Sequence, residues 1–429
     1  MQWVREPLGE ICRKGRGRIQ TGPFGSQLHE SDYSADGTPV VMPADISDGR
    51  VAVTRIARVP ESHVERLKRH KLAKGDIVYG RRGDIGRQAL VRDENIGWLC
   101  GTGCLKISLG DSPLISEFLH RYLSTKAVVS WIEGQAVGAT MPNLNTGILE
   151  RVPVFYPEDK TTQKKIAAIL LAYDELIENN QRRIALLEKM AEEIYREWFV
   201  RLRFPGHEKV RFIKGVPDGW QVKKLGELVR TQYGYTASAE TEGEGPKFLR
   251  ITDIAAAAIN WEFVPHCKIE EKDEEKYLLR EGDIVVARTG ATVGYAKRIN
   301  KHIPKAVFAS YLVRLIPKRK RDAIFLGLSV ERNAFKDFIW MFVTGAAQPQ
   351  ANATTMALFP VFYPPETLLN EFNRIVEPIL DEKELLLNQA AVLARTRDAL
   401  LPRLISGKLS VENLDIQFPP SMEETAHAV

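Results

Sequence analysis

Two stretches of the chain carry apolar residues at the spacing of a long amphipathic helix. The first, from Thr161 to Val200, contains no Gly and no Pro, and its seam residues recur at alternating steps of four and three. The seam comprises Ile166, Leu170, Tyr173, Ile177, Asn180, Ile184, Leu187, Ala191, Ile194 and Trp198. This heptad pattern is typical of a coiled-coil helix. Asn180 is the one polar member, and a polar residue at such a position can fix the register of a helix pair.

The second stretch runs from about Thr367 to Leu404. Its seam comprises Phe372, Val376, Ile379, Leu386, Ala390, Leu393, Leu400 and Leu404. Lys383 and Arg397 interrupt this seam, and Pro378 predicts either a first turn or a kink. The simplest way to bury both seams is to pack them against each other, antiparallel, as an intramolecular coiled coil.

Shorter apolar runs, separated by Gly, Pro, Asp and Asn, fill the rest of the chain. Residues 1–158 hold four runs that predict strands, at 38–43, 76–80, 88–91 and 105–109, followed by one or two helices over 114–133. Residues 206–365 hold four more, at 247–251, 283–287, 295–299 and 311–316, followed by a helix over 323–343. Each region therefore predicts a mixed α/β globule.

The two globules share an internal repeat. KGDIVYGRRG (74–83) returns as EGDIVVARTG (281–290), an offset of 207 residues. The same offset relates Pro142 to Pro349 and Pro153 to Pro360. A period of about half the chain predicts two copies of one domain rather than a solenoid of short units.

The expected fold class is therefore α/β (α+β), with two similar globular domains separated by two long antiparallel coiled-coil helices and related by a pseudo-two-fold axis. The expected boundaries are 1–158 for the first globule, 159–205 for the central helix, 206–365 for the second globule, 366–409 for the distal helix and 410–429 for a flexible tail.

Composition narrows the functional class only a little. The 429 residues carry a formal net charge of +5, which permits nucleic-acid binding without requiring it. The four cysteines, Cys12, Cys100, Cys104 and Cys267, form no paired metal or disulfide pattern, so we expect reduced thiols in a cytoplasmic protein. The first residues do not read as a signal peptide, and no apolar run approaches the roughly 18 residues that a membrane span needs.

Familiar catalytic motifs are absent from the sequence. It contains no phosphate-binding Gly-x-x-x-x-Gly-Lys-Ser/Thr loop, no Gly-x-Gly-x-x-Gly after a strand and no His-Glu-x-x-His pair. Asp76 and Asp283 precede strands in Gly-Asp turns, where a turn role is favoured over general-base catalysis. We therefore expect no enzyme activity, no cofactor and no metal. A chain with two similar globules on a spacer is better suited to recognising a bipartite DNA site than to catalysis.

Four segments carry a resemblance to a known family. They are QTGPFGSQLHESDYSADGTPVV (20–41), LIENNQRRIALLEKMAEEIYREWFV (176–200), YGYTASAETEGEGPKFLRITDI (233–254) and LLPRLISGKL (400–409). In their joint order they resemble the specificity (S) subunit of type I restriction–modification systems. The resemblance covers nearly the whole chain except its last twenty residues.

The resemblance implies a role for each segment. Each globule would be a target-recognition domain that contacts one half of a split site in double-stranded DNA. The helices would set the distance between the half-sites and carry two modification subunits, which bind S-adenosylmethionine and methylate adenine. Restriction subunits with ATP-driven translocation and nuclease activity would join this core. The chain itself would hold none of these cofactors and would not enter a membrane.

Two other functions fit parts of the sequence. A stand-alone DNA methyltransferase or nuclease would act without a partner, which a methyl-transfer assay on this chain alone would show. A DNA-binding regulator with two domains would bind DNA but would not co-purify with a methyltransferase. The bases that are read do not follow from the sequence, because they depend on loop geometry and DNA shape.

Candidate DNA contacts lie directly after the two Gly-Asp-Ile-Val strands and in two further segments, 22–27 and 233–238, which occupy corresponding places in the two globules. Arg side chains can bond to guanine or to phosphate, and small polar side chains can reach base edges. The candidates are Phe24, Ser26, Gln27, Arg81 and Arg82 in the first globule, and Tyr233, Tyr235, Thr236, Arg288 and Thr289 in the second. For each of them a purely structural role in a turn is the alternative. For the helix pair we expect Ile177, Asn180, Ile184, Leu187, Trp198, Leu386 and Leu393 to close the core between the helices.

Overall fold

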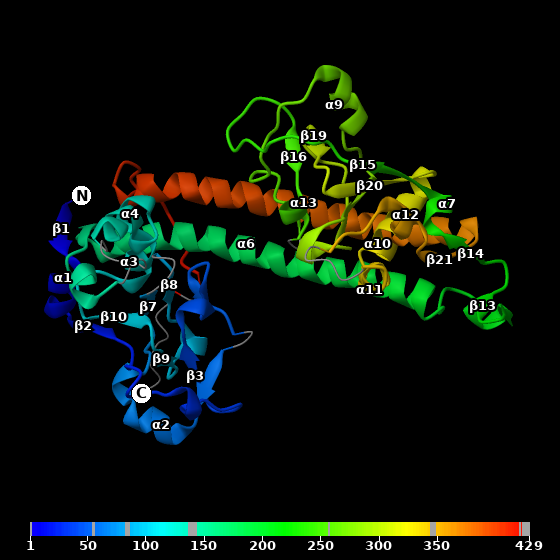
Figure 1. Cartoon of the computed structure of the whole chain (residues 1–429). Coiled ribbons are helices and arrows are strands. Elements are labelled where there is room, and N and C mark those ends of the chain that lie inside the picture. Colours follow the sequence, from blue (N-terminus) through cyan, green and yellow to red (C-terminus); the bar gives the residue numbers. More distant parts are fainter. Residues whose placement is uncertain are drawn as a thin grey trace. The chain divides into compact units, whose positions relative to one another are not determined.

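The computed structural model describes residues 2–53, 56–81, 86–135, 144–255, 258–343, 349–419 and 422 (Figure 1). The chain divides into two compact units, one formed by Met1–Asn179 with Ala390–Val429 and the other by Asn180–Gln389. Each unit contains one globule and part of each of two long helices, α6 (Lys160–Tyr195) and α13 (Glu366–Ile405).

The globule of the first unit is built on a four-stranded antiparallel sheet. Its strand order is β2 (Arg16–Thr21), β10 (Cys104–Gly110), β7 (Ile77–Gly80) and β8 (Gln88–Leu90). Smaller sheets join β1 (Trp3–Pro7) to β11 (Pro153–Pro157), β3 (Thr38–Val41) to β6 (Ala57–Val59) and β9 (Leu99–Cys100), and β4 (Ile46–Ser47) to β5 (Arg50–Val51). The α-helices are α1 (Leu8–Lys14), α2 (Glu61–Arg66), α3 (Ser116–Leu123), α4 (Lys126–Gln135) and α5 (Thr146–Glu150).

The globule of the second unit repeats this strand order. Its main sheet runs β15 (Val229–Tyr233), β20 (Leu312–Pro317), β17 (Ile284–Ala287) and β18 (Ala296–Arg298). The pairs β14 (Gln221–Lys224) with β21 (Pro360–Tyr363) and β16 (Lys247–Leu249) with β19 (Ala306–Phe308) match the β1–β11 and β3–β9 pairs in direction. A hairpin, β12 (Phe212–Ile213) with β13 (Val216–Pro217), precedes them. The α-helices are α7 (Leu225–Leu228), α8 (Ile251–Ile254), α9 (Glu271–Tyr277), α10 (Ala323–Val330), α11 (Asn333–Trp340) and α12 (Ala353–Ala357). The prediction of a duplicated α/β domain is confirmed.

The strand of the repeated Gly-Asp-Ile-Val motif is apolar along its length because its sheet is covered on both faces. In β7, Ile77 and Tyr79 belong to one buried cluster and Val78 to another. In β17, Ile284 and Val286 belong to one buried cluster, and Val285 and Ala287 belong to another. Successive side chains of a strand point to opposite faces, so a strand with two covered faces is apolar throughout.

The Gly and Asp of the motif form the turn that leads into the strand. Gly75 and Gly282 have φ of +81° and +85°, the left-handed region that Gly adopts without steric cost. The next residue turns its side chain back on the loop: Asp76 Oδ2 accepts a hydrogen bond from the backbone N–H three residues earlier at 2.9 Å, and Asp283 Oδ2 does so at 2.8 Å. The expected turn role of both aspartates is confirmed.

Each of these aspartates also forms a buried ion pair with the neighbouring strand. Asp76 lies 3.3 Å from Lys106 Nζ on β10, and Asp283 lies 3.2 Å from Arg314 Nη1 on β20. All four side chains are less than a tenth exposed. Removing one partner of such a pair leaves an uncompensated buried charge, so both aspartates have a structural role at this repeated position.

The apolar stretch expected to form one helix over 323–343 forms two. α10 ends at Val330 and α11 starts at Asn333, because Arg332 between them is extended, with φ −77° and ψ 152°. The matching stretch of the first globule likewise splits into α3 and α4, as one of the two alternatives foresaw. Apolar spacing alone does not locate such a break.

Within each unit the segments of α6 and α13 pack antiparallel. In the first unit Ile166 and Leu170 share a buried cluster with Leu404, while Asp174, further along α6, bonds to Arg397, which lies earlier in α13. In the second unit the Tyr195 ring lies 6.2 Å from that of Phe372. The helix α13 continues through Pro378, and α6 is followed by a π-helical turn at Arg196–Val200.

The two cations that interrupt the second seam have acidic partners on α6. Lys383 Nζ lies 2.7 Å from Glu188 in the second unit, and Arg397 Nη1 donates to Asp174 at 2.6 Å in the first. A charge at a seam position is tolerated when an opposite charge meets it, which explains why the heptad pattern survives these interruptions.

The residues expected to close the helix pair are buried to different degrees. Asn180, Ile184, Trp198 and Leu386 are less than a tenth exposed. Ile177, Leu187 and Leu393 are half-buried. Trp198 contacts Phe372 and Phe199 and so belongs to the main core of the second unit rather than to a helix seam alone.

The beginning of the segment expected to be a flexible tail is packed. Val411 is 1 % exposed within the core of the first unit, and Lys165 Nζ on α6 donates to the Glu412 carbonyl at 2.7 Å. Its apolar side chain explains the difference, because burying Val411 offsets the cost of ordering the chain. Residues 420–421 and 423–429 of that segment lie outside the described residues.

Candidate nucleic-acid interface

The candidate loops of the first unit meet at one edge of its main sheet. In an antiparallel sheet β2 and β7 end where β10 begins, so the residues after them become neighbours. The Gly22 N–H, just past β2, donates to the Cys104 carbonyl at 2.9 Å. The Arg81 N–H, just past β7, donates to the Gly103 carbonyl at 2.8 Å. The topology thus brings together two loops that are far apart in the sequence.

The second unit has the same edge. The Gly234 N–H donates to the Leu312 carbonyl at 3.3 Å, and the Arg288 N–H donates to the Tyr311 carbonyl at 3.0 Å. These two bonds correspond to the two bonds of the first unit. The candidate residues after β15 and β17 are therefore neighbours as well.

Close backbone contact makes glycine necessary where the first loop leaves the sheet. A Cβ on Gly22 would lie 2.0 Å from the Gly101 carbonyl oxygen, and one on Gly234 would lie 2.1 Å from that of Ala309. Neither contact is possible for a real side chain, so both copies need glycine here.

A third segment completes each edge. The Leu144 N–H donates to the Arg81 carbonyl at 3.0 Å, and the Ala351 N–H donates to the Arg288 carbonyl at 2.8 Å. The next residue caps a short helix in both copies: Asn145 Oδ1 accepts from a backbone N–H of α5 at 3.0 Å, and Asn352 Oδ1 accepts from one of α12 at 2.7 Å. Each edge is thus formed by three chain segments in one repeated arrangement.

The loop after β2 presents two of its three candidates to solvent. Phe24 is 54 % exposed and Ser26 is exposed. Gln27 is half-buried, and its Oε1 accepts from the Phe24 N–H at 3.2 Å and from Arg69 Nη2 at 3.3 Å. Gln27 therefore shapes the loop, while Phe24 and Ser26 are free to contact a ligand.

His70 contacts Arg69, the residue that donates to Gln27 in this loop, and it does so in its neutral form. It is 2 % exposed, and its Nε2 accepts a hydrogen bond from Arg69 Nε at 2.9 Å. Burial, followed by the positive charges of Arg69 and Lys106, lowers the pKa of His70 to about 4. The imidazole is thus uncharged near neutral pH and can remain an acceptor.

The two equivalent arginines, Arg81 and Arg288, are engaged differently. Arg81 Nε donates to the Leu144 carbonyl at 3.1 Å, which ties this side chain to the third segment. The Arg288 guanidinium instead lies 4.9 Å from the centre of the Tyr233 ring, at cation–π distance. Among the described residues no hydrogen-bond partner meets Arg288 Nε. Arg82 lies outside the described residues.

Tyr233 is held in place at the side of Arg288. It is 43 % exposed, and its hydroxyl oxygen accepts a hydrogen bond from the Ala353 N–H at 3.1 Å. Ala353 begins α12, so the bond joins the end of β15 to the third segment. The ring is thereby fixed beneath the guanidinium group.

The other three candidates of the second unit differ in accessibility. Thr236 is exposed. Tyr235 is half-buried, with its ring 5.2 Å from that of Tyr277. Thr289 is 3 % exposed and pairs as a β-bridge with Gln350, so its side chain faces the protein and not solvent.

Two tyrosines near this edge were not among the contacts predicted from the sequence. Tyr311 directly precedes β20 and is 56 % exposed. Tyr295 is 37 % exposed, and the centre of its ring lies 4.2 Å from Lys336 Nζ. Tyr311 occupies the place of Gly103 beside the equivalent arginine, but the offset of 207 residues pairs Gly103 with Ser310, so an alignment at that offset misses Tyr311 by one position.

Other kinds of site have little support in the part of the chain that the structure describes. That part holds no group of three or more His, Cys, Asp or Glu residues that could bind a metal ion. Burial raises the pKa of Cys12 and of Cys100 to about 12, so these thiols stay protonated and unreactive at neutral pH. No helix among the described residues is long and apolar enough to cross a membrane.

Comparison with known proteins gives a consistent result. A family model described as the type I restriction modification DNA specificity domain matches residues 2–189 and 217–377. The chain is 26 % identical to the type I restriction enzyme MjaIX specificity subunit of Methanocaldococcus jannaschii over 89 % of each chain. It is 20 % identical to the HindI specificity subunit of Haemophilus influenzae, covering 95 % of this chain and 99 % of the relative.

A solved structure shares the fold. The crystal structure of the type I restriction–modification S subunit from M. genitalium aligns with a TM-score of 0.61 at 17 % identity. The alignment covers 94 % of this chain and 96 % of that one.

Proposed function

The chain belongs to the family of type I restriction–modification DNA specificity domains, and from this membership we propose that it reads a bipartite DNA site for a multi-subunit enzyme. Each globule acts as a target-recognition domain for one half-site. The observation that carries this proposal is the repeated sheet edge: both copies bring the same three segments together, and the exposed side chains there differ between the copies. Two domains that share one fold but differ in their contact residues are suited to recognising two different half-sites.

We assign DNA contact to the accessible side chains of each edge. These are Phe24 and Ser26 in the first domain, and Tyr233, Thr236 and Arg288 in the second. Gln27, Arg81, Tyr235 and Thr289 act mainly by holding the loops in shape, because their contacts or burial are internal to the protein. Arg82 remains a candidate on its sequence position alone.

Catalysis resides in partner subunits under this proposal. Modification subunits supply S-adenosylmethionine and adenine methylation, and restriction subunits supply translocation and cleavage. Two modification subunits fit a chain with two recognition domains and two long helices. The absence of recognised catalytic motifs in the sequence supports a purely recognising role for this chain.

Methyl transfer with and without a modification subunit tests the proposal. The chain is co-expressed with the modification subunit from a type I system of its own host, and the purified complex is assayed for incorporation of labelled methyl groups into DNA. We expect adenine methylation by the complex and none by the chain alone. Activity of the chain alone would make it a methyltransferase, and failure to co-purify would favour a DNA-binding regulator.

A further inference from the structure

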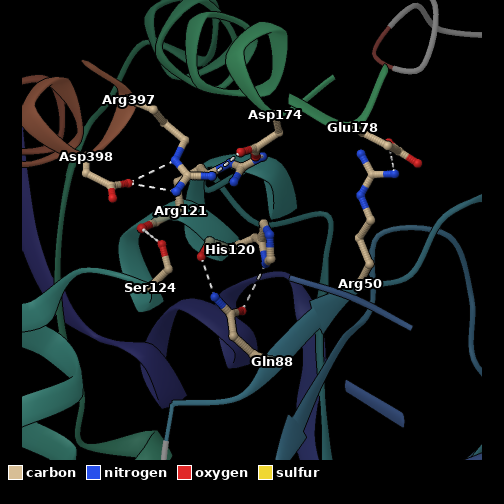
Figure 2. Close-up of polar contacts among 9 residues, drawn as sticks. All are labelled: Arg50, Gln88, His120, Arg121, Ser124, Asp174, Glu178, Arg397 and Asp398. Atoms are coloured by element: carbon tan, nitrogen blue, oxygen red, sulfur yellow. Dashed lines mark hydrogen bonds and ion pairs between the residues drawn. The ribbon is translucent and has the colours of Figure 1, made fainter. Parts of the chain in front are cut away.

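A charged cluster in the first unit joins the globule to the long helices. We call it the clamp, and it consists of Arg50, Arg121, Asp174, Glu178 and Arg397 (Figure 2). Arg50 begins β5 and Arg121 lies in α3, so both belong to the globule. Asp174 and Glu178 lie on α6, and Arg397 lies on α13. Neither DNA contact nor the hydrophobic core accounts for this cluster.

Asp174 is the centre of the clamp. Arg121 Nη2 forms an ion pair with one carboxylate oxygen, and Arg397 Nη1 donates to the other at 2.6 Å. The Asp174 side chain is 16 % exposed and that of Arg121 is 14 % exposed, so water screens this pair only weakly. One carboxylate therefore links α6 both to the globule and to α13.

The second arm of the clamp lies one helical turn further along α6. Arg50 forms an ion pair with Glu178, which is four residues after Asp174 and so lies on the same helix face. This arm reaches the small β4–β5 sheet rather than α3. The clamp thus connects the globule to α6 through two separate ion pairs.

A buried hydrogen-bonded pair connects the clamp to the main sheet. Gln88 Nε2 on β8 donates to the His120 carbonyl at 2.6 Å, and its Oε1 lies 3.0 Å from His120 Nδ1. Burial, followed by the positive charge of Arg121, keeps the pKa of His120 well below its usual value. His120 is adjacent to Arg121, and β8 pairs with β7, which ends at Gly80, directly before Arg81. A displacement of Arg121 would therefore be passed to the sheet edge proposed to meet DNA.

The space around the clamp is not closely packed. A cavity of about 430 Å³ lies there, lined by Gly49, Gly86 and Val129 of the globule and by Leu170 and Leu401 of the helices. Close packing normally fixes the angle between two bodies. Ile166 and Leu170 of α6 share a buried cluster with the globule, whereas beside the cavity directional ion pairs contribute to fixing the angle.

We propose that Arg121, through its ion pair with Asp174, is a positioning residue that fixes the orientation of the first recognition domain and thereby the spacer length the complex accepts. This inference rests on the proposed bipartite function. DNA rises ~3.4 Å per base pair. A shift of a few ångströms at the sheet edge is thus enough to admit a spacer one base pair longer or shorter.

Two matched substitutions separate positioning from general stability. Arg121→Gln and Arg397→Gln each remove one guanidinium from Asp174 and leave the other. Only Arg121→Gln cuts the link to the globule, whereas Arg397→Gln cuts a link between the two helices. Each variant is assayed as the full chain in complex with the modification subunit, on duplexes that keep both half-sites and vary the spacer by one base pair.

The readout is the ratio of methylation rates on the cognate spacer and on the altered spacers. For Arg121→Gln we expect this ratio to fall about tenfold, with the half-site bases unchanged, and for Arg397→Gln we expect it to stay within about twofold of wild type. An unaltered ratio in Arg121→Gln, or an equal fall in both variants, would overturn the inference. If Arg121→Gln does not fold, Arg50→Gln on the second arm gives the same test.

The control with wild-type chain separates this inference from the function on which it rests. A wild-type complex that methylates no bipartite site refutes the proposed function. A wild-type complex with a strict spacer, together with an equally strict Arg121→Gln complex, refutes only the role of the clamp.

Discussion

Arg81 and Arg288 show how two copies of one fold can use an equivalent residue differently. The backbone N–H and carbonyl groups of both residues bond to equivalent partners, so their positions are the same. Their side chains differ, because Arg81 bonds to the Leu144 carbonyl and Arg288 stacks on Tyr233. A planar guanidinium held against a ring is well placed to make two parallel bonds to a guanine edge.

Arg288→Ala should therefore weaken use of one half-site only. We expect a loss of ~1–3 kcal/mol for the cognate base and little change at the other half-site, since a bidentate contact discriminates by about this amount. Methylation rates on duplexes with single-base changes in each half-site measure the effect. Tyr233→Phe keeps the ring but removes the hydroxyl that accepts the Ala353 N–H bond, and it should lose only part of the discrimination. An equal loss on every sequence would make Arg288 a phosphate contact.

His70 predicts a pH dependence of stability. Because the pKa of His70 is lowered to about 4 from 6.5, the unfolded chain binds a proton at a higher pH than the folded chain does. Stability from this residue is thus complete above pH 6.5 and is lost as pH falls toward 4, by about 3 kcal/mol in all. Urea unfolding of wild type and of His70→Gln between pH 7 and 4 should show the difference. His120 is also buried, so the variant should remove only part of the wild-type slope.

At the residue scale, the sequence indicates the loop in which a candidate side chain lies but not the direction in which that side chain points. It made Arg288 and Thr289 equal candidates, because both follow the repeated strand. It did not show that Thr289 turns inward to pair with Gln350, a residue 61 positions later in the chain. Side-chain direction in such a loop is set by long-range backbone pairing, which local patterns do not encode.

The long helices are the elements that sequence pattern predicted most fully. Heptad spacing located both helices, because seams of this length can be buried in few ways. Their antiparallel packing followed from connectivity, since the chain has to return from the second globule. The sequence did not explain why Lys383 and Arg397 interrupt the second seam. In the structure each of them forms an ion pair with an acidic residue of α6. The break between α10 and α11 went unpredicted, since it depends on the backbone of Arg332 in a stretch that is apolar on both sides.

Lengthening the helices should lengthen the unread spacer. Four residues inserted after Asn180 and four after Asn388 add ~6 Å to each helix and perturb the heptad as a stutter. At ~3.4 Å per base pair, the gap between half-sites should grow by about one or two base pairs, with unchanged half-sites. Sequencing of methylated bases in cells carrying the variant measures the gap.

A matched insertion controls for the added residues. Four residues placed between Lys214 and Gly215, in the exposed turn of the β12–β13 hairpin, should leave the gap as it is. If the helix variant stays fully active with the original gap, the helices do not set the spacing.

At the scale of the whole molecule, duplication explains both the fold and its chemistry. The 207-residue offset recurs in the turn glycines, the buried aspartates and the helix-capping asparagines. These shared residues build the domain, whereas the exposed residues at its edge differ between the copies, and we propose that they specify different bases. The sequence revealed the shared framework because repetition is visible in one chain.

The chain alone should bind DNA weakly and with strong dependence on salt. Contacts to phosphates release counterions, so their contribution falls steeply as salt rises. We expect the affinity of the isolated chain for cognate and scrambled duplexes to differ little, and the modification subunit to increase the difference. Fluorescence anisotropy at 50 and 200 mM salt would measure both effects, and tight salt-insensitive binding by the chain alone would contradict the expected division of labour.

A map of methylated adenines, in a host that carries the modification subunit with and without this chain, tests most directly whether the chain specifies a bipartite site. We expect one methylated motif that depends on the chain and consists of two specific half-sites separated by a gap of fixed length and arbitrary sequence. A chain-dependent motif without a gap, or a methylation pattern that is the same in both hosts, would contradict this expectation.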